Sequence, residues 1–135
     1  MERAVELHGH LGPFLILGLK MGLRAERLLG GRVRTCEVEV IGRKPYLCTV
    51  DGVRAVIGDN VVVKEGDGIV ATFHEAGGKE VVVRVKEEVI KRYAHVPWEQ
   101  CKEKAHEVLG ENEENLLGHC LFLGYPSGLP EGRKV

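Results

Sequence analysis

Two histidines separated by a single glycine are the first candidates for chemistry in this sequence. His8-Gly9-His10 lies just before Pro13, where a long helix is expected to begin. Gly9 has no side chain, so the backbone can bend and turn both imidazoles toward one point. The positive end of the helix dipole keeps the rings neutral, and neutral imidazole is the form that binds metal. From the spacing alone we favour two solvated or helix-capping histidines, and the alternative is two metal ligands.

A cysteine followed three positions later by an aspartate is the second candidate. Cys48 is expected at the end of a short strand, and Asp51 at the start of the helix that follows. A thiol in such a position can have a lowered pKa, and the thiolate either binds metal or attacks an electrophile. Asp51 would orient a histidine or accept a proton. The alternative is a buried, inert cysteine followed by an ordinary helix-capping aspartate.

The remaining cysteines give weaker signals. Cys36 alternates with valines and is expected in the core, whereas Cys101 and His106 lie about 140° apart around an expected helix and should not share a ligand. His119 and Cys120 form a second pair, which would reach the site from the C-terminal region or from a partner subunit; the alternative is a packed cysteine beside a surface histidine. Since no Cys-x-x-Cys motif occurs, a metal site has to be assembled from distant parts of the chain.

Length, composition and charge exclude several classes of protein. The chain has 135 residues, of which 44% are hydrophobic and 29% are charged, as expected for one soluble domain. Lys and Arg number 19 against 20 Asp and Glu, so the net charge of -1 argues against a nucleic-acid-binding module. No apolar run approaches the roughly 20 residues of a membrane span, and the start of the chain is unlike a signal peptide. We therefore expect a cytoplasmic protein without nucleic-acid or membrane partners.

The element that follows the two histidines is an amphipathic helix over residues 12–29. Leu15, Leu19 and Leu23 recur at helical spacing, and two glycines end the helix. Gly18 and Gly22 lie four residues apart inside it, where each weakens the helix by roughly 1 kcal/mol relative to alanine. Two such residues on one side predict the close approach of another backbone or of a ligand.

The rest of the chain alternates between strand and helix patterns. The expected elements are strands at 33–41, from residue 61, at 69–74 and at 80–85, and helices at 50–57, 85–93, 97–109 and, more weakly, 111–117. This order predicts an α+β domain, which we place at residues 1–124. Residues 125–135 have no core pattern and are expected to form an extended tail.

Both candidate segments resemble the FmdE family, which is named after one of the subunits of formylmethanofuran dehydrogenase, and the resemblance covers roughly residues 6–85. In that family a His-Gly-His-x-Cys-Pro-Gly opening leads into a long helix with small residues, and a Cys-x-x-Asp helix and a Gly-Lys-Gly-Asn loop follow. The matching residues here are His8-Gly9-His10-Leu11, Pro13, Gly18, Met21, Cys48 and Asp51. The resemblance implies an α+β core whose mixed sheet packs on the long N-terminal helix, with a cleft where the His and Cys segments meet.

The resemblance also implies a cofactor and partners. Members of the family carry metal, typically zinc, and are usually homodimers. Their name comes from operon association with tungsten- or molybdenum-dependent formylmethanofuran dehydrogenases, so a larger redox enzyme complex is a further expected partner. The resemblance supplies no defined reaction for proteins of this kind.

The chain departs from the family pattern in four places. Gly12 replaces the cysteine that follows the second histidine, and Pro13-Phe14 replaces the Pro-Gly after it. The Gly-Lys-Gly-Asn loop is not recognisable at residues 58–60, and we expect a core without the C-terminal zinc ribbon of many members. The loss of one of two site cysteines weakens the case for dithiol chemistry.

Three functions are compatible with these residues. The first is a metal-binding accessory protein in which His8, His10 and Cys48 hold zinc or another divalent transition metal, with a fourth position for water or substrate and Asp51 as an orienting group or general base. The second is a non-catalytic interaction or dimerisation protein with a degenerate site, whose tail serves as a docking arm. The third is a metal-free thiol enzyme that uses Cys48 with a histidine as base. The sequence does not decide whether the protein is an enzyme.

Overall fold

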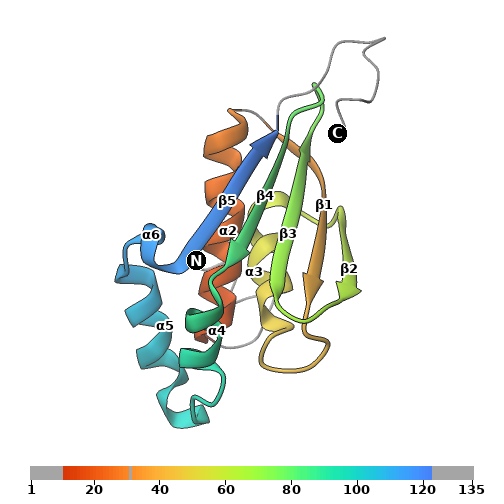
Figure 1. Ribbon diagram of the computed structural model, residues 1–135. Helices are drawn as coiled ribbons and strands as arrows, with labels where there is room; N and C mark the ends of the chain where they lie inside the picture. Colours follow the sequence, from red (N-terminus) through yellow and green to blue (C-terminus); the bar gives the residue numbers. More distant parts are fainter. Residues whose placement is uncertain (1–10, 31, 123–135) are drawn as a thin grey trace.

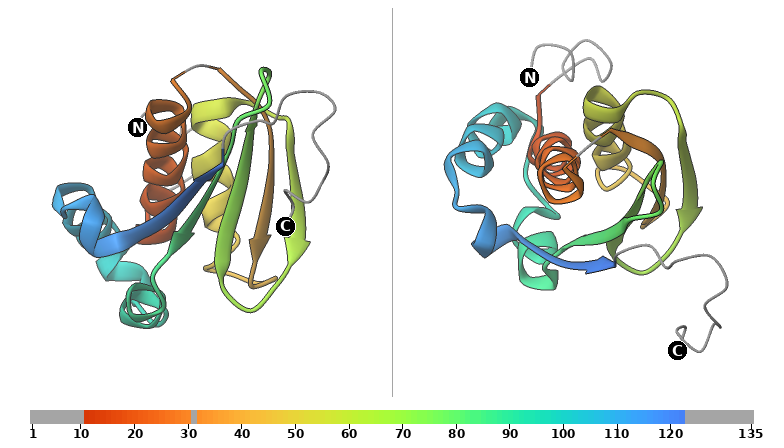
Figure 2. Two further views of the ribbon diagram at one scale, coloured as in Figure 1. Left: turned by 45° about the horizontal axis from the view of Figure 1, so that its top comes forward. Right: turned by 90° about the horizontal axis from the view of Figure 1, so that it is seen from above.

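Two long helices lie against one face of a five-stranded mixed sheet (Figure 1 and Figure 2). The computed structural model describes residues 11–30 and 32–122. The described elements are α2 (Pro13–Leu29), β1 (Val33–Val40), α3 (Cys48–Ile57), β2 (Val61–Glu65), β3 (Ile69–Glu75), β4 (Glu80–Val85), α4 (Glu87–Tyr93), the 3-10 helix η1 (Trp98–Gln100), α5 (Cys101–Gly110), α6 (Glu113–Leu116) and β5 (Leu117–Phe122). The predicted α+β class, with a mixed sheet on the long helix α2, is confirmed.

The sheet has the strand order β2-β1-β3-β4-β5, in which β1 and β2 are parallel and the other neighbours are antiparallel. Side chains alternate between its two faces, so Val38 of β1 is buried while Glu37 and Glu39 are exposed. Buried apolar residues of neighbouring strands lie side by side on one face of the sheet, because Val38 pairs with Ala71 and Ala71 pairs with Val83. This face packs on the helices and forms the core.

The glycines of α2 determine how closely α3 can pack against it. A Cβ added at Gly18 would collide with the carbonyl group of Thr49, and one added at Gly22 would lie 2.9 Å from the Val56 Cβ. The helix ends at Gly30, whose φ of 66° lies in the left-handed region that glycine favours. The predicted close approach of another backbone is confirmed, and that backbone belongs to the first turn of α3.

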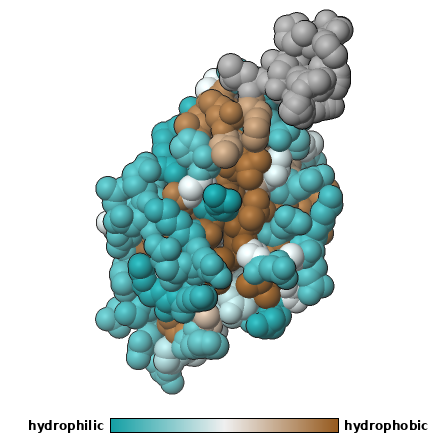
Figure 3. Space-filling model, in the orientation of Figure 1, coloured by the Kyte–Doolittle hydropathy of each residue, from teal (hydrophilic) through white to brown (hydrophobic). Residues whose placement is uncertain are grey.

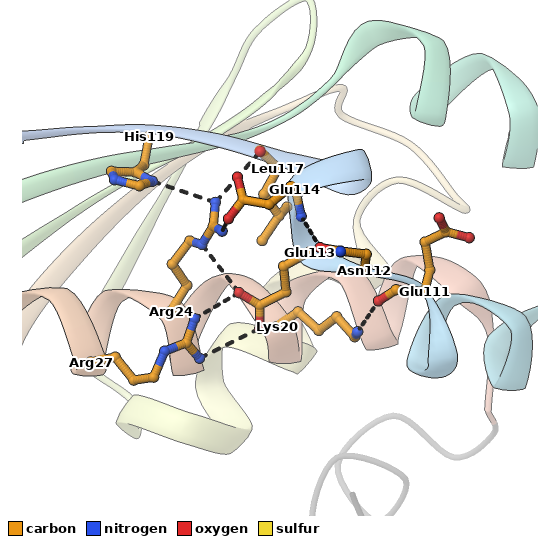
Figure 4. A network of polar contacts seen from close by, with 9 residues as sticks. All are labelled: Lys20, Arg24, Arg27, Glu111, Asn112, Glu113, Glu114, Leu117 and His119. Carbon is orange, nitrogen blue, oxygen red and sulfur yellow. Dashed lines mark hydrogen bonds and ion pairs between the residues drawn. The ribbon is translucent and has the colours of Figure 1, made fainter.

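Two buried cations tie α2 to the C-terminal elements (Figure 4). Arg24 is 4% exposed, and it donates from Nε to Glu113 Oε1 at 3.1 Å and from Nη2 to Glu114 Oε2 at 2.7 Å. The Nζ of Lys20, also buried, donates to the Glu111 carbonyl oxygen at 3.0 Å. The polar side of α2 is therefore covered by the segment that leads from α5 into β5.

The strand β5 corrects the prediction for the C-terminal part of the domain. The helical turn expected at 111–117 ends at Leu116, and the next six residues pair antiparallel with β4, with Cys120 opposite Val82. The partner strand β4 lies far away in the sequence, so no local sequence pattern predicts this pairing. The strand also gives Arg24 a further acceptor, the Leu117 carbonyl oxygen at 3.5 Å.

The second face of the sheet carries none of the described helices, and Figure 3 shows an apolar strip along it. Alternation places Val70, Thr72 and Val82 on this face, together with the exposed Cys120 and Phe122 of β5. Phe122 is 48% exposed. An antiparallel sheet can leave one face in water, but such faces are ordinarily polar, so this strip is a candidate contact surface.

Candidate functional site

Cys48 begins helix α3 and does not end a strand. Residues 44–47 form a turn, and the Cys48 N–H donates to the Pro45 carbonyl oxygen at 3.1 Å. The strand predicted over 46–49 is wrong, because the apolar Tyr46 packs edge-on against Phe14, with ring centroids 5.2 Å apart. The contact between Gly18 and α3 brings this first turn beside the start of α2.

Cys48 lies in the wall of a pocket of about 550 Å³. The other walls come from the start of α2, the turn before α3 and the segment between α4 and α5, and they include Gly12, Phe14, Lys44, Trp98 and Cys101. Helices α2, α3 and α5 all begin at this end of the molecule, at the bottom of Figure 1. The pocket therefore collects residues from three helix starts that are far apart in the sequence.

The two predicted histidine ligands, His8 and His10, lie outside the described residues. The chain that carries them enters α2 through Gly12, which is part of the pocket wall. Their convergence with Cys48 remains a prediction.

Asp51 lies one turn beyond Cys48 on α3. The two residues line a second hollow of about 160 Å³, which adjoins Lys44 and Leu47. A carboxylate oxygen of Asp51 is 3.9 Å from Nη1 of Arg54, and both side chains are about one-third exposed. Asp51 therefore lies near the thiol and is partly open to solvent.

Burial raises the pKa of the Cys48 thiol to about 11, and the charge of Asp51 acts in the same direction. Lys44 opposes this shift, and a charge on Cys101 reinforces it. The lowered pKa that thiolate chemistry would need is not found, and the alternative of a buried cysteine agrees with a side chain that is 8% exposed. The metal-free protein therefore holds Cys48 as a neutral thiol, which does not favour a metal-free thiol enzyme.

Cys101 is the residue of this pocket that the sequence motifs did not reveal. It is the first residue of α5 and is partly buried, and burial raises its pKa. Cys101 lines the same pocket as Cys48, whereas His106 is exposed and does not line that pocket. The sequence feature that could have drawn attention to Cys101 is its position, because the sequence predicts both Cys48 and Cys101 near the start of a helix.

The remaining candidates lie elsewhere. Cys36 is buried in the core, as predicted. His119 has its Nδ1 3.4 Å from Nη1 of Arg24, and Cys120 is exposed on the uncovered face, so the expected packed cysteine is not packed. Neither residue lines the pocket of Cys48. Among the described residues no three His, Cys, Asp or Glu side chains are grouped to hold a metal ion.

Comparison with known proteins places these features in a family. A protein-family model described as "FmdE, Molybdenum formylmethanofuran dehydrogenase operon" matches residues 7–119. The chain belongs to the FmdE family. The match to FmdE spans the two histidines, the pocket and the first part of β5, and so extends well beyond residue 85, where the sequence resemblance ended. No curated protein matches the sequence.

None of the described helices of this FmdE domain is both long and apolar enough to cross a bilayer. The tail predicted at 125–135 lies outside the described residues, so the boundary at residue 124 remains a prediction.

Proposed function

We propose that this FmdE-family protein is a metal-binding accessory protein in which His8, His10 and Cys48 hold zinc or another divalent transition metal. The observation that carries the proposal is that Cys48 and Gly12, which follows the two histidines closely in the sequence, line the same pocket.

The proposed ligands, two imidazoles and one thiolate, are donors that zinc accepts. Zinc takes imidazole nitrogen and thiolate sulfur, and three such ligands leave one tetrahedral position to be filled. Cys48 is a neutral thiol in the metal-free protein, so it must release its proton when metal binds. The role we propose for Asp51, which lines the adjoining hollow, is to accept that proton or a hydrogen bond from a ligand imidazole. A bound zinc ion would supply Lewis acidity to whatever occupies the fourth position.

Metal analysis of the purified chain tests this assignment. Protein prepared without added metal should contain about one zinc per chain, and His8→Ala/His10→Ala and Cys48→Ala should each lower the affinity at least about tenfold. His106→Ala and Cys120→Ala are matched controls, because both side chains are exposed and neither lines the pocket. Equal metal content in all variants would refute the ligand set.

We infer a second role in self-association, as a homodimer formed through the uncovered face of the sheet. Phe122, Cys120 and Val82 support it, because they leave an apolar strip on a face that carries no described helix (Figure 3). Phe122→Glu should convert a dimer into a monomer in sedimentation or light-scattering measurements. Leu109→Glu, at an exposed apolar residue of α5, is the control and should leave the mass unchanged.

The family description supports association of this chain with a molybdenum formylmethanofuran dehydrogenase. We propose residues 125–135 as the docking arm for that larger enzyme. Deletion of this segment should abolish co-purification with the dehydrogenase while leaving metal content unchanged. Retained co-purification would exclude the docking arm.

A further inference from the structure

We propose that the pocket of about 550 Å³ beside Cys48 binds a small carboxylate that carries an aromatic ring. The ring would lie against the apolar walls of the pocket, and Lys44 would hold the carboxylate. This site is built only from residues that the structure describes. It goes beyond the proposed function, because it requires neither of the two histidines and no metal ion.

The walls of the pocket favour an apolar body. Carbon surface comes from Pro13, Phe14, Pro45 and Val96. The volume lies within the range of pockets that hold small organic molecules, which are mostly apolar with a few polar groups. Trp98 also lines the pocket and is 71% exposed, so its indole can pack against a second ring. A ring bound here would remove apolar surface of both partners from water.

Lys44 determines the charge of the ligand. It is the charged side chain that the described residues give to this pocket, and it forms no ion pair with any of them. Its charge reaches the Cys48 thiol, where it opposes the rise in pKa. Asp51 lies in the adjoining smaller hollow and does not line this pocket. An anionic group is therefore favoured over a cationic one.

The two cysteines add no negative charge to the pocket. Burial raises the pKa of Cys48 to about 11 and also raises the pKa of Cys101, so both thiols are neutral at physiological pH. A neutral thiol is close to a small apolar group in its packing. The lining thus combines one cation with apolar surface, which is complementary to an amphipathic anion.

A larger hollow of about 930 Å³ does not show this complementarity. It lies between the ends of β1 and β4, the start of β3 and helix α4, and charges of both signs line it, among them Arg84, Glu87 and Lys91. Lys91 is already paired with Glu87, with Nζ 3.8 Å from a carboxylate oxygen. This hollow therefore favours neither sign of ligand, and its lysine provides a control.

Trp98 provides the readout, because it is the only tryptophan of the chain and lines the pocket. Phenylbutyrate added to the full chain should change the tryptophan fluorescence in a saturable way. Its neutral amide should bind about threefold to fivefold more weakly, because it cannot pair with Lys44. Absence of a saturable change would overturn the site, and equal affinity for the acid and the amide would overturn the role of charge. Both results are independent of how any variant folds.

Variants test the two parts of the pocket separately. Lys44→Ala should weaken phenylbutyrate binding about threefold to fivefold and abolish the preference over the amide. Lys91→Ala, at an exposed lysine outside this pocket, is its control. Val96→Glu should weaken binding at least about tenfold, because it places a like charge in the apolar wall, and Val63→Glu, at an exposed residue of β2, is its control. Unchanged binding in Lys44→Ala would overturn the inference.

The His8→Ala/His10→Ala variant separates this inference from the proposed function. It should bind phenylbutyrate as the wild-type chain does, because Lys44 and not a metal ion holds the carboxylate. If this variant loses binding while Lys44→Ala keeps it, the metal ion holds the anion, and the inference fails although the proposed function stands. If the metal content is equal in all ligand variants but Lys44→Ala loses the preference for the acid, the proposed function fails and this inference stands.

Discussion

Cys36 and Cys48 are both buried, yet only Cys48 borders open space. Cys36 is 1% exposed within the core, where burial and then the charge of Glu37 raise its pKa to about 12. It stays a neutral thiol with no room for a ligand, so its role is packing. Cys48 has a similar burial but adjoins a pocket that also contains Cys101. Burial alone therefore does not distinguish a cysteine that packs the core from one that is available for chemistry. The space beside the thiol makes the difference.

Gly18 provides a prediction at the same scale. A Cβ there would collide with the Thr49 carbonyl, so Gly18→Ala should lower the free energy of unfolding by about 1–3 kcal/mol through overpacking. Gly110→Ala is the control, because a Cβ at Gly110 meets no atom within 4 Å and alanine is the better helix former. Urea denaturation should show opposite signs for the two variants. A neutral Gly18→Ala would contradict the close packing of α2 and α3.

Helix α2 connects the pocket with the C-terminal elements. Its first turn forms part of the pocket wall, and its glycines allow α3 to pack closely. Its buried cations contact the segment that leads through α6 into β5. Lys20 and Arg24 do not belong to the leucine repeat of this helix. In the folded chain these side chains are buried, and their charges are met by Glu113, Glu114 and backbone carbonyl oxygens (Figure 4).

Removal of Arg24 tests this connection. Arg24→Ala should destabilise the protein by about 3 kcal/mol, because it leaves Glu113 without one cation and leaves a gap between α2 and β5. Arg27→Ala is the matched control, since Arg27 also pairs with Glu113 but its side chain is 58% exposed and should contribute less than about 1 kcal/mol. Chemical denaturation compares the two variants directly. Equal losses of unfolding free energy in Arg24→Ala and Arg27→Ala would show that the burial of Arg24 does not increase its contribution to stability.

At the scale of the whole molecule, acid stability depends on the same cluster. Burial favours the neutral form of Glu113, but its hydrogen bond with Arg27 and the charges of Arg27, Arg24 and Lys20 outweigh burial and lower its pKa. A carboxyl whose pKa is lower in the folded than in the unfolded state stabilises the protein above its unfolded value, near 4.5. This stabilisation is lost as the pH falls through the folded pKa.

We therefore expect the wild-type chain to lose stability below about pH 4.5, and Glu113→Gln to lose less between neutral and acid pH. Urea denaturation at several pH values measures both curves. Asn115→Ala, at an exposed residue of the same helix α6, is the control for local disruption. If the free energy of unfolding fell equally with acid pH in the wild-type and Glu113→Gln proteins, groups other than Glu113 would be responsible for the loss.

Metal removal is the second prediction for the whole molecule. A ligand that binds only the folded state at a thousand times its dissociation constant stabilises that state by about 4 kcal/mol. A chelator should therefore lower the unfolding temperature of the wild-type chain and leave His8→Ala/His10→Ala unchanged. Differential scanning calorimetry measures both. The same shift in both proteins would contradict a site built on these histidines.

The sequence by itself determined the family and most of the elements, but not β5 or the start of α3. Helical spacing from Leu15 to Leu23, alternation around Val38 and a glycine turn at 77–78 are local patterns, and local backbone geometry follows them. The resemblance to the FmdE family, seen in the His-Gly-His and Cys-x-x-Asp motifs, is confirmed by the family model, which matches residues 7–119. The start of α3 was misplaced because a short apolar stretch at 46–49 has no periodicity that separates a strand from a turn.

Only the tertiary structure decided which residues that are distant in the sequence lie side by side. The pairing of β5 with β4, the burial of Arg24 and the shared pocket of Cys48 and Cys101 all join residues far apart in the chain. Such contacts depend on the packing of α2 against α3 and α5, and the sequence around either partner does not encode the distance between them. The sequence thus named Cys48 as a candidate ligand, and the fold supplied Cys101 as its neighbour.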